Sequence, residues 1–168
     1  QAEVDHLTAL KSADVADLER ISHAFSVIAR AVQPSVVNVE SRSKLEISDE
    51  ELRRLFSERG IQVPPNRGIG SGIILDEEGH IVTNNHVVAE AEVIEVTLAD
   101  GRAFRARLVG TDPKTDLAVI RINAERLHPA RLGDSDQVEV GNLVLAIGSP
   151  FRLGHSVSHG IISAMGRT

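Results

Sequence analysis

The longest regular hydrophobic pattern in the chain lies near its N-terminus. Six apolar residues recur there at steps of three and four, namely Val15, Leu18, Ile21, Phe25, Ile28 and Val32. This spacing places them on one stripe of an amphipathic helix. Ser12 is placed to cap the helix, Asp14 suits its first turn, and Pro34 stops it. We therefore predict a helix over 12–32 that either packs on the rest of the domain or forms an oligomer contact.

Short β-branched runs separated by turn residues make up most of the remaining chain. The first, "PSVVNVES" from Pro34 to Ser41, reads as a strand, and a long charged insertion with a short helix of its own follows over 42–67. Beyond it, turn signals such as "DEEG", "ADG" and "TDPKT" separate seven runs: "GSGIILD", "GHIVTN", "VIEVTLAD", "RAFRARLVG", "DLAVIRI", "NLVLAIGS" and "SVSHGIIS". This rhythm predicts an all-β barrel or sandwich, with a hairpin turn at "ADG" because Asp-Gly tolerates positive φ.

Composition narrows the function classes. A chain of 168 residues with 42% hydrophobic residues fits one ordinary domain or two small ones. The net charge of −6, with Lys and Arg scattered among acids, makes nucleic acid an unsuitable partner. No apolar run approaches the roughly 20 residues that cross a bilayer. The chain has no Cys, which excludes disulfides, thiolate metal sites and a cysteine nucleophile.

Two residues are candidates for chemistry, although each has an ordinary structural interpretation. His86 closes the β-branched run "IVTNNHVV", where a lone histidine is usually structural, and Asp116 opens "DLAVIRI", where an aspartate is usually a turn residue. Together, however, a His at the end of one barrel strand and an Asp about thirty residues later at the start of another follow the His…Asp…Ser order of chymotrypsin. The pair therefore supports a catalytic interpretation that neither residue supports alone.

The motifs around these residues make the interpretation specific. "FSVIARAVQPSVVNVES", "GSGIILDEEGHIVTNNHVV", "ADGRAFRARLVGTDPKTDLAVIRI" and "LGDSDQVEVGNLVLAIGSPFRLGHSVSHGIISAMGR" resemble the trypsin-like protease domain of the HtrA/Deg family, over nearly the whole chain from Phe25 to Arg167. The resemblance implies a chymotrypsin/trypsin-like fold of antiparallel β-barrels. It implies a helical segment over 1–33, a first barrel over 34–132 with a variable insertion at 42–67, and the first strands of an incomplete second barrel over 133–168. It also implies that His86 is the general base and Asp116 its orienter.

The serine of that family is not found. Its "GNSGG"-type turn does not occur in the sequence. Ser71 in "GIGSGI" lacks the flanking glycines of a nucleophile elbow, since Ile69 and Ile73 stand there, and we expect it to be structural. Ser156 and Ser158, beside His155 and His159, are weak candidates for a local site. The two histidines are too far apart to share a zinc ion, because four residues along a strand span about 13 Å.

The resemblance therefore predicts the N-terminal portion of an ATP-independent serine endopeptidase for protein quality control, inactive by itself. It implies unfolded or misfolded protein substrates, no cofactor or metal, and a periplasmic or cell-envelope location. It also implies a homo-oligomer, a trimer by family, or pairing through exposed barrel strands. The alternative is a non-catalytic scaffold or chaperone-like module in which His86 and Asp116 have no catalytic role.

Overall fold

The N-terminal helix is present where the apolar stripe predicts it. The structure, a computed structural model, describes residues 14–43, 54, 58, 66–149 and 156–166. Helix α2 runs over Asp14–Val32 and is followed by the 3₁₀ turn η1, Gln33–Ser35, whose second residue is Pro34. Pro34 thus ends the α-helix as expected, because proline at this position cannot donate the next helical bond. The proposed Ser12 cap lies outside the described residues.

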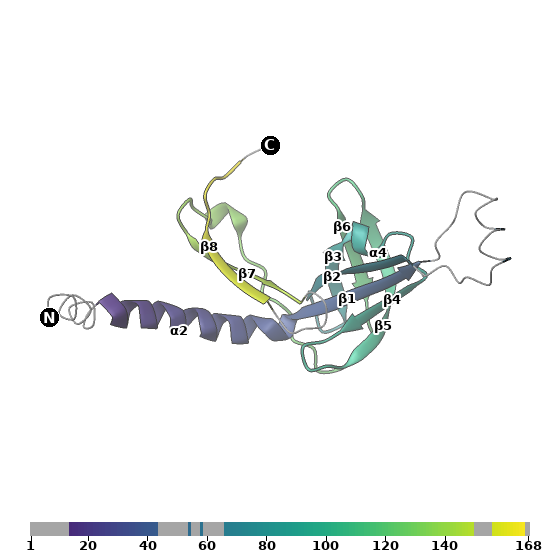
Figure 1. The fold of residues 1–168 in the computed structure, drawn as a ribbon, viewed down its shortest axis with the longest axis horizontal. Helices are drawn as coiled ribbons and strands as arrows, with labels where there is room; N and C mark the ends of the chain where they lie inside the picture. Colours follow the sequence, from purple (N-terminus) through teal and green to yellow (C-terminus); the bar gives the residue numbers. More distant parts are fainter. Residues whose placement is uncertain (1–13, 44–53, 55–57, 59–65, 150–155, 167–168) are drawn as a thin grey trace.

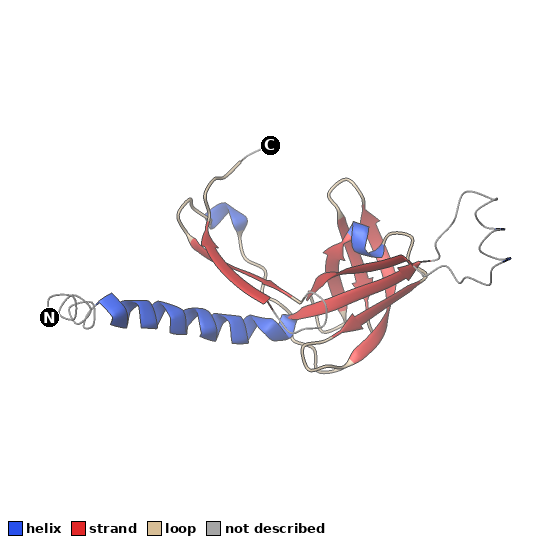
Figure 2. Ribbon diagram, viewed as in Figure 1, coloured by secondary structure: helices blue, strands red, loops and turns tan. Residues whose placement is uncertain are grey.

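Six antiparallel strands form a closed barrel (Figure 2). They follow the spatial order β1-β2-β3-β6-β5-β4 and have these bounds: β1 Val36–Ser43, β2 Asn66–Ile74, β3 His80–Asn84, β4 Val93–Thr97, β5 Ala103–Asp112 and β6 Leu117–Arg121. Alternate apolar residues point inward, and Val37, Val39, Ile81, Val96 and Ile120 are fully buried. The all-β barrel with one N-terminal helix is therefore confirmed.

The insertion is shorter at both ends than the charge pattern predicts. Strands β1 and β2 pair from Val36 opposite Ile73 to Ser43 opposite Asn66, so Arg42 and Arg67 are ladder partners. Backbone pairing continues past the last apolar side chain, which a pattern of hydrophobic residues does not reveal. The short helix predicted within the insertion falls on a segment of which the structure describes only residues 54 and 58.

The "ADG" turn forms as predicted. Leu98 N donates to Arg102 O at 2.8 Å, and Gly101 adopts a positive φ of 88° between β4 and β5. Glycine meets no strain in this conformation, so the hairpin closes with the expected residue at the expected place.

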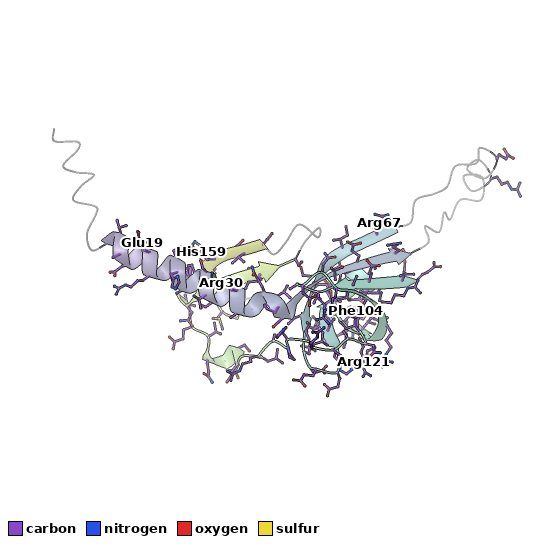
Figure 3. All side chains as sticks on the ribbon, turned by 90° about the horizontal axis from the view of Figure 1, so that it is seen from below. Glu19, Arg30, Arg67, Phe104, Arg121 and His159 are labelled. Carbon is purple, nitrogen blue, oxygen red and sulfur yellow. The ribbon has the colours of Figure 1, made fainter. Side chains whose placement is uncertain are left out.

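A second, two-stranded sheet stands apart from the barrel and beside α2 (Figure 1). It consists of β7, Leu143–Gly148, and β8, Ser156–Ile161, and follows the 3₁₀ turn η2, Ser135–Gln137. The rings of Phe25 in α2 and His159 in β8 stack with centroids 5.2 Å apart, and His159 is labelled against the helix in Figure 3. The N-terminal helix therefore packs on this sheet.

Candidate active site

His86 lies on a single helical turn at the rim of the barrel. Strand β3 ends at Asn84, and α4 covers Asn85–Val88, closed by a hydrogen bond from Ala89 N to Asn85 O of 2.8 Å. The expectation that His86 closes a strand is therefore wrong by two residues. Val87 and Val88 are buried, whereas the His86 side chain remains 69% exposed. The two valines hold the turn in the core, and the imidazole is directed outward.

The glycines of β2 make room for this turn. A Cβ at Gly68 would lie 2.3 Å from Val87 O, and one at Gly70 would lie 2.6 Å from Val87 Cγ2. Ser41 Oγ also donates to Val87 O at 2.5 Å. Gly68 and Gly70 leave this part of β2 without side chains, and Val87 of α4 occupies that space. This role of the glycines was not predicted, although their two-residue spacing on a strand indicates a close approach.

Asp116 binds His86 through both of its carboxylate oxygens. Its Oδ1 accepts the backbone N–H of His86 at 2.9 Å, and its Oδ2 lies 2.6 Å from His86 Nδ1. Its own carbonyl accepts Asn85 N at 3.0 Å, and its φ is 56°, a left-handed conformation that aspartate tolerates better than most residues. Residues thirty positions apart are thus fixed by backbone and side-chain bonds together.

Asn84 is a site residue that sequence reasoning missed. Its Nδ2 donates to Asp116 Oδ2 at 3.1 Å and to Asp116 O at 3.3 Å. The side chain does not cap α4, although an asparagine before a helical turn is normally assigned to that role. Instead it donates to Oδ2, the same carboxylate oxygen that His86 Nδ1 approaches.

These donors lower the pKa of Asp116 below its ordinary value of 3.8. The backbone N–H of His86 has the largest effect on this pKa, followed by the side-chain bond to His86, and Asn84 contributes less. Asp116 is therefore ionised at neutral pH and can only accept hydrogen bonds, so Nδ1 carries a hydrogen. In the neutral ring the exposed Nε2 is then left as the proton acceptor. Chemically, the pair can take a proton from a neighbouring hydroxyl and stabilise the imidazolium that results.

Comparison with known proteins shows the family to which the chain belongs. The family model of the trypsin-like peptidase domain matches residues 70–168 of the sequence. The chain belongs to the trypsin-like peptidase family. It is 40% identical over 166 residues to a probable periplasmic serine endoprotease, DegP-like, of Pseudomonas putida, covering 86% of this chain and 35% of the relative. A relative with the same name in Chlamydia trachomatis is 41% identical over 175 residues, again across 35% of its length.

Solved structures identify the branch of the family. The HtrA-type protease AlgW with tripeptide is 39% identical, with a TM-score of 0.69 over 86% of this chain and 41% of that one. An AlgW variant with decapeptide gives a TM-score of 0.70 at 38% identity over 86% of this chain and 46% of that one. The chain is therefore of HtrA type and has a trypsin-like fold, and it spans about a third of the length of the curated relatives that it matches.

The other candidates of the sequence analysis occupy different places in this HtrA-type chain. Ser71 accepts a hydrogen bond from Ser149 N and lies in the sheet, as a structural residue would. Ser158 and His159 lie on exposed β8 opposite Ala146 and Leu145, and His155 is outside the described residues. Within the described ranges, no three His, Cys, Asp or Glu side chains gather as a metal site. The helices in these ranges also lack a segment with the length and hydropathy of a membrane span.

A second histidine and aspartate on the barrel have nearly the same geometry. His80 Nδ1 lies 2.7 Å from Asp76 Oδ2, and His80 N donates to Asp76 Oδ1 at 3.0 Å. These residues are four positions apart in one turn, and the His80 side chain is only 32% exposed. The geometry within each pair does not show which of the two is catalytic. The greater exposure of the His86 imidazole and the family motif around it favour His86 and Asp116.

Proposed function

We propose that the chain supplies the general base, His86, and its orienter, Asp116, to an HtrA-like serine endopeptidase that degrades unfolded or misfolded proteins in the periplasm or cell envelope. The observation that carries the proposal is the 2.6 Å approach of Nδ1 to the Asp116 carboxylate on an exposed imidazole. Support for the substrate class and location comes from the HtrA-type relatives, whose names describe periplasmic endoproteases.

In this mechanism the serine hydroxyl attacks the peptide carbonyl carbon while its proton passes to His86 Nε2. The protonated ring then delivers that proton to the leaving amine, and water hydrolyses the acyl-enzyme by the same transfers in reverse. Asp116 holds the Nδ1–H and stabilises the imidazolium without taking the proton. In this mechanism no step requires a metal or cofactor.

We further propose that the serine and its oxyanion hole come from residues other than these 168. The sequence has no "GNSGG"-type turn, so Ser71, Ser156 and Ser158 do not lie in one. Residues 34–132 would then form a complete first barrel and residues 133–168 the start of a second, with the reaction between the two. By itself the chain should show no measurable peptidase activity.

A complementation assay tests this function. The chain is mixed with the serine-bearing segment of the Pseudomonas putida relative, and cleavage of denatured fluorescent casein is followed. We expect activity only in the mixture. His86→Ala should abolish it, and Asp116→Asn should lower turnover by about 10⁴-fold because the wrong tautomer is then favoured.

His80→Ala is the matched control, because it removes an imidazole that has nearly the same bond to a carboxylate elsewhere on the barrel. Activity should survive this change. Equal loss in the His80 and His86 variants would show that the assay reports folding rather than catalysis, and full activity of His86→Ala would exclude the proposed base.

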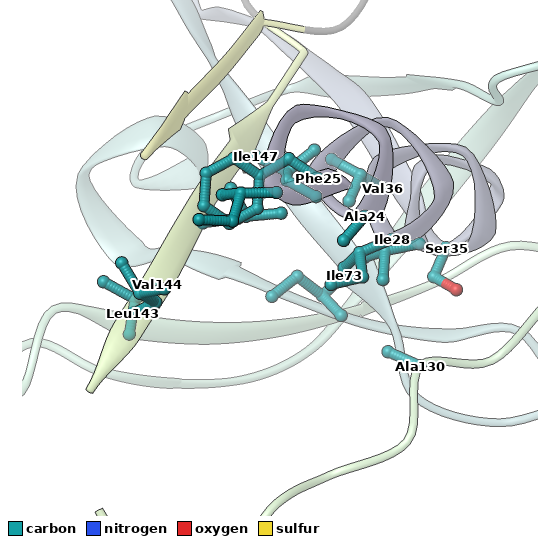
Figure 4. Close-up of a pocket in the computed structure, with 13 residues that line it drawn as sticks. Ala24, Phe25, Ile28, Ser35, Val36, Ile73, Ala130, Leu143, Val144 and Ile147 are labelled. Atoms are coloured by element: carbon teal, nitrogen blue, oxygen red, sulfur yellow. The ribbon is translucent and has the colours of Figure 1, made fainter. Parts of the chain in front are cut away.

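A binding function is the second candidate, and the apolar surface between α2 and β7 favours it. Ile21, Phe25, Leu143 and Ile147 line a cavity there of about 610 Å³ (Figure 4). A module that holds unfolded chains at such a surface would suppress aggregation of a denatured protein. Suppression that persists unchanged in His86→Ala, without cleavage in the complemented mixture, would support this alternative.

A further inference from the structure

Ser149, the residue directly after β7, is held on the outside of the barrel by two side chains. Its N–H donates to Ser71 Oγ at 2.9 Å, and its carbonyl accepts Asn38 Nδ2 at 2.8 Å. Asn38 and Ser71 are direct partners in the β1–β2 ladder. Both backbone groups of Ser149 therefore bind to adjacent side chains of the barrel, in the way that they would bind to a neighbouring strand.

The burial of Asn38 shows that this contact has a cost in folding free energy. The residue is 2% exposed, and its Oδ1 has no hydrogen-bond partner among the described residues. A buried polar atom without a partner is uncommon and calls for an explanation. A β-branched apolar residue, such as the neighbouring Val37 and Val39, would suit the strand without that cost. What Asn38 adds is the bond that its amide donates to Ser149.

Ser71 also connects this contact to the strand that leads to His86. Its carbonyl accepts Thr83 Oγ1 at 2.8 Å. Thr83 directly precedes Asn84, whose amide holds the Asp116 carboxylate. Ser71 thus binds the end of β7 through its hydroxyl and β3 through its carbonyl, so the second sheet and the histidine–aspartate pair share one point of attachment.

We propose that Asn38 and Ser71 are positioning residues that fix the β7–β8 sheet relative to the barrel rim that carries His86 and Asp116. That the contact holds the sheet, the structural half of the proposal, follows from the hydrogen bonds alone. That it affects catalysis, the catalytic half, rests on the proposed function, in which a peptide reacts between the barrel and the second sheet. Loss of either bond would leave the His86–Asp116 pair intact but would release the β7–β8 sheet from the barrel.

Amide hydrogen exchange of the 168-residue chain, followed by NMR, tests the structural half. Asn38→Leu and Ser71→Ala should raise the exchange rate of the Ser149 amide and of β7 at least tenfold. Ser71→Thr keeps the hydroxyl and should restore protection. Thr97→Val is the matched control, because Thr97 is the other ladder partner of Asn38 and makes no bond to Ser149. Unchanged exchange at Ser149 in Ser71→Ala, or an equal rise throughout the barrel, would overturn the proposal.

Kinetics of the complemented enzyme test the catalytic half. Ser71→Ala should lower kcat by about 10- to 100-fold, the usual effect of misplaced reacting groups, while Ser71→Thr and Thr97→Val retain the wild-type value. A wild-type kcat in Ser71→Ala, despite faster exchange at Ser149, would overturn the positioning role. If wild-type chain shows no activity in the mixture, the proposed function fails, and the exchange measurement still decides whether the contact holds the sheet.

Discussion

At the scale of single residues, three aspartates form the same pair of hydrogen bonds. Asp76, Asp100 and Asp116 each accept the backbone N–H of a residue whose side chain they also bind, respectively His80, Arg102 and His86. In each case that backbone bond has the largest effect on the pKa of the carboxyl group, which lies below 3.8. The lowered pKa therefore reports how the carboxylate is held and does not by itself identify a catalytic residue.

This ordering of causes predicts how Asp116 titrates. Because the backbone N–H of residue 86 remains when the ring is removed, the pKa of Asp116 should stay below 3.8 in His86→Ala, although less so than in the wild type. A carboxyl whose pKa is lower in the folded chain stabilises the fold above its unfolded pKa. That contribution disappears as the pH falls through the folded pKa. Stability contributed by Asp116 should therefore be lost only below about pH 4.

Side-chain carboxyl ¹³C signals measured by NMR between pH 2 and 6 check this prediction, with the urea-unfolded chain as the reference. Asp76 serves as an internal control, because the His86 substitution leaves its partner His80 in place. An Asp116 that titrates at the unfolded value in His86→Ala would show that the imidazole, not the backbone, holds the carboxylate.

At the scale of secondary-structure elements, hydrophobic periodicity predicted the helix and every strand of the barrel. It succeeded because alternate residues such as Val37, Val39 and Val96 must face one core. It failed at the ends of elements. Ser41 was taken as the end of β1, which continues to Ser43 through backbone pairing, and His86 was placed at the end of a strand, whereas β3 ends at Asn84 and His86 lies in the α4 turn. Burial of Val87 and Val88 fixes the local structure there.

The candidate site was predicted only in part, for a related reason. His86 and Asp116 were found because the family motif surrounds each of them, and the structure brings them into contact. Asn84 was not assigned a role, because nothing local indicates that its amide turns toward a residue thirty-two positions away. The contribution of Gly68 and Gly70 depends on which element covers β2, and that information is not contained in the strand itself.

The glycine face of β2 leads to a prediction about stability. A methyl group at Gly68 would meet the backbone carbonyl of Val87, whereas at Gly70 it would meet only the end of the Val87 side chain. Gly70→Ala should therefore lower the free energy of unfolding by about 1–3 kcal/mol, as overpacking usually does, and Gly68→Ala by more. Urea denaturation followed by circular dichroism measures both values.

Gly110→Ala in β5 is the matched control, since a methyl group there meets nothing within 4 Å. It should change the free energy of unfolding by less than about 0.5 kcal/mol. Equal effects at Gly70 and Gly110 would contradict the assignment of the β2 glycines to the close approach of α4.

At the scale of the whole molecule, apolar residues are divided unequally between two places. The barrel closes over its own core, but the surface shared by α2 and β7 stays open: Ile21 is 45% exposed, Ile28 48% and Leu143 61%. A surface of this kind is typical of one that another polypeptide covers. We therefore expect the chain to associate through the α2–β7 surface and not through the closed barrel.

We predict that the chain associates with itself through this surface. Sedimentation velocity of the chain at increasing concentration should show self-association, and Ile21→Glu or Leu143→Glu should weaken it at least tenfold because each places a charge in the buried contact. The urea midpoint of the barrel should not change, since neither residue belongs to its core. Leu108→Glu is the control, because Leu108 is 47% exposed on β5, outside this surface. Equal weakening by Leu108→Glu would show that added charge, not this surface, controls association. A monomer at all concentrations would contradict self-association and indicate that a different polypeptide, such as the segment that carries the serine, covers the α2–β7 surface.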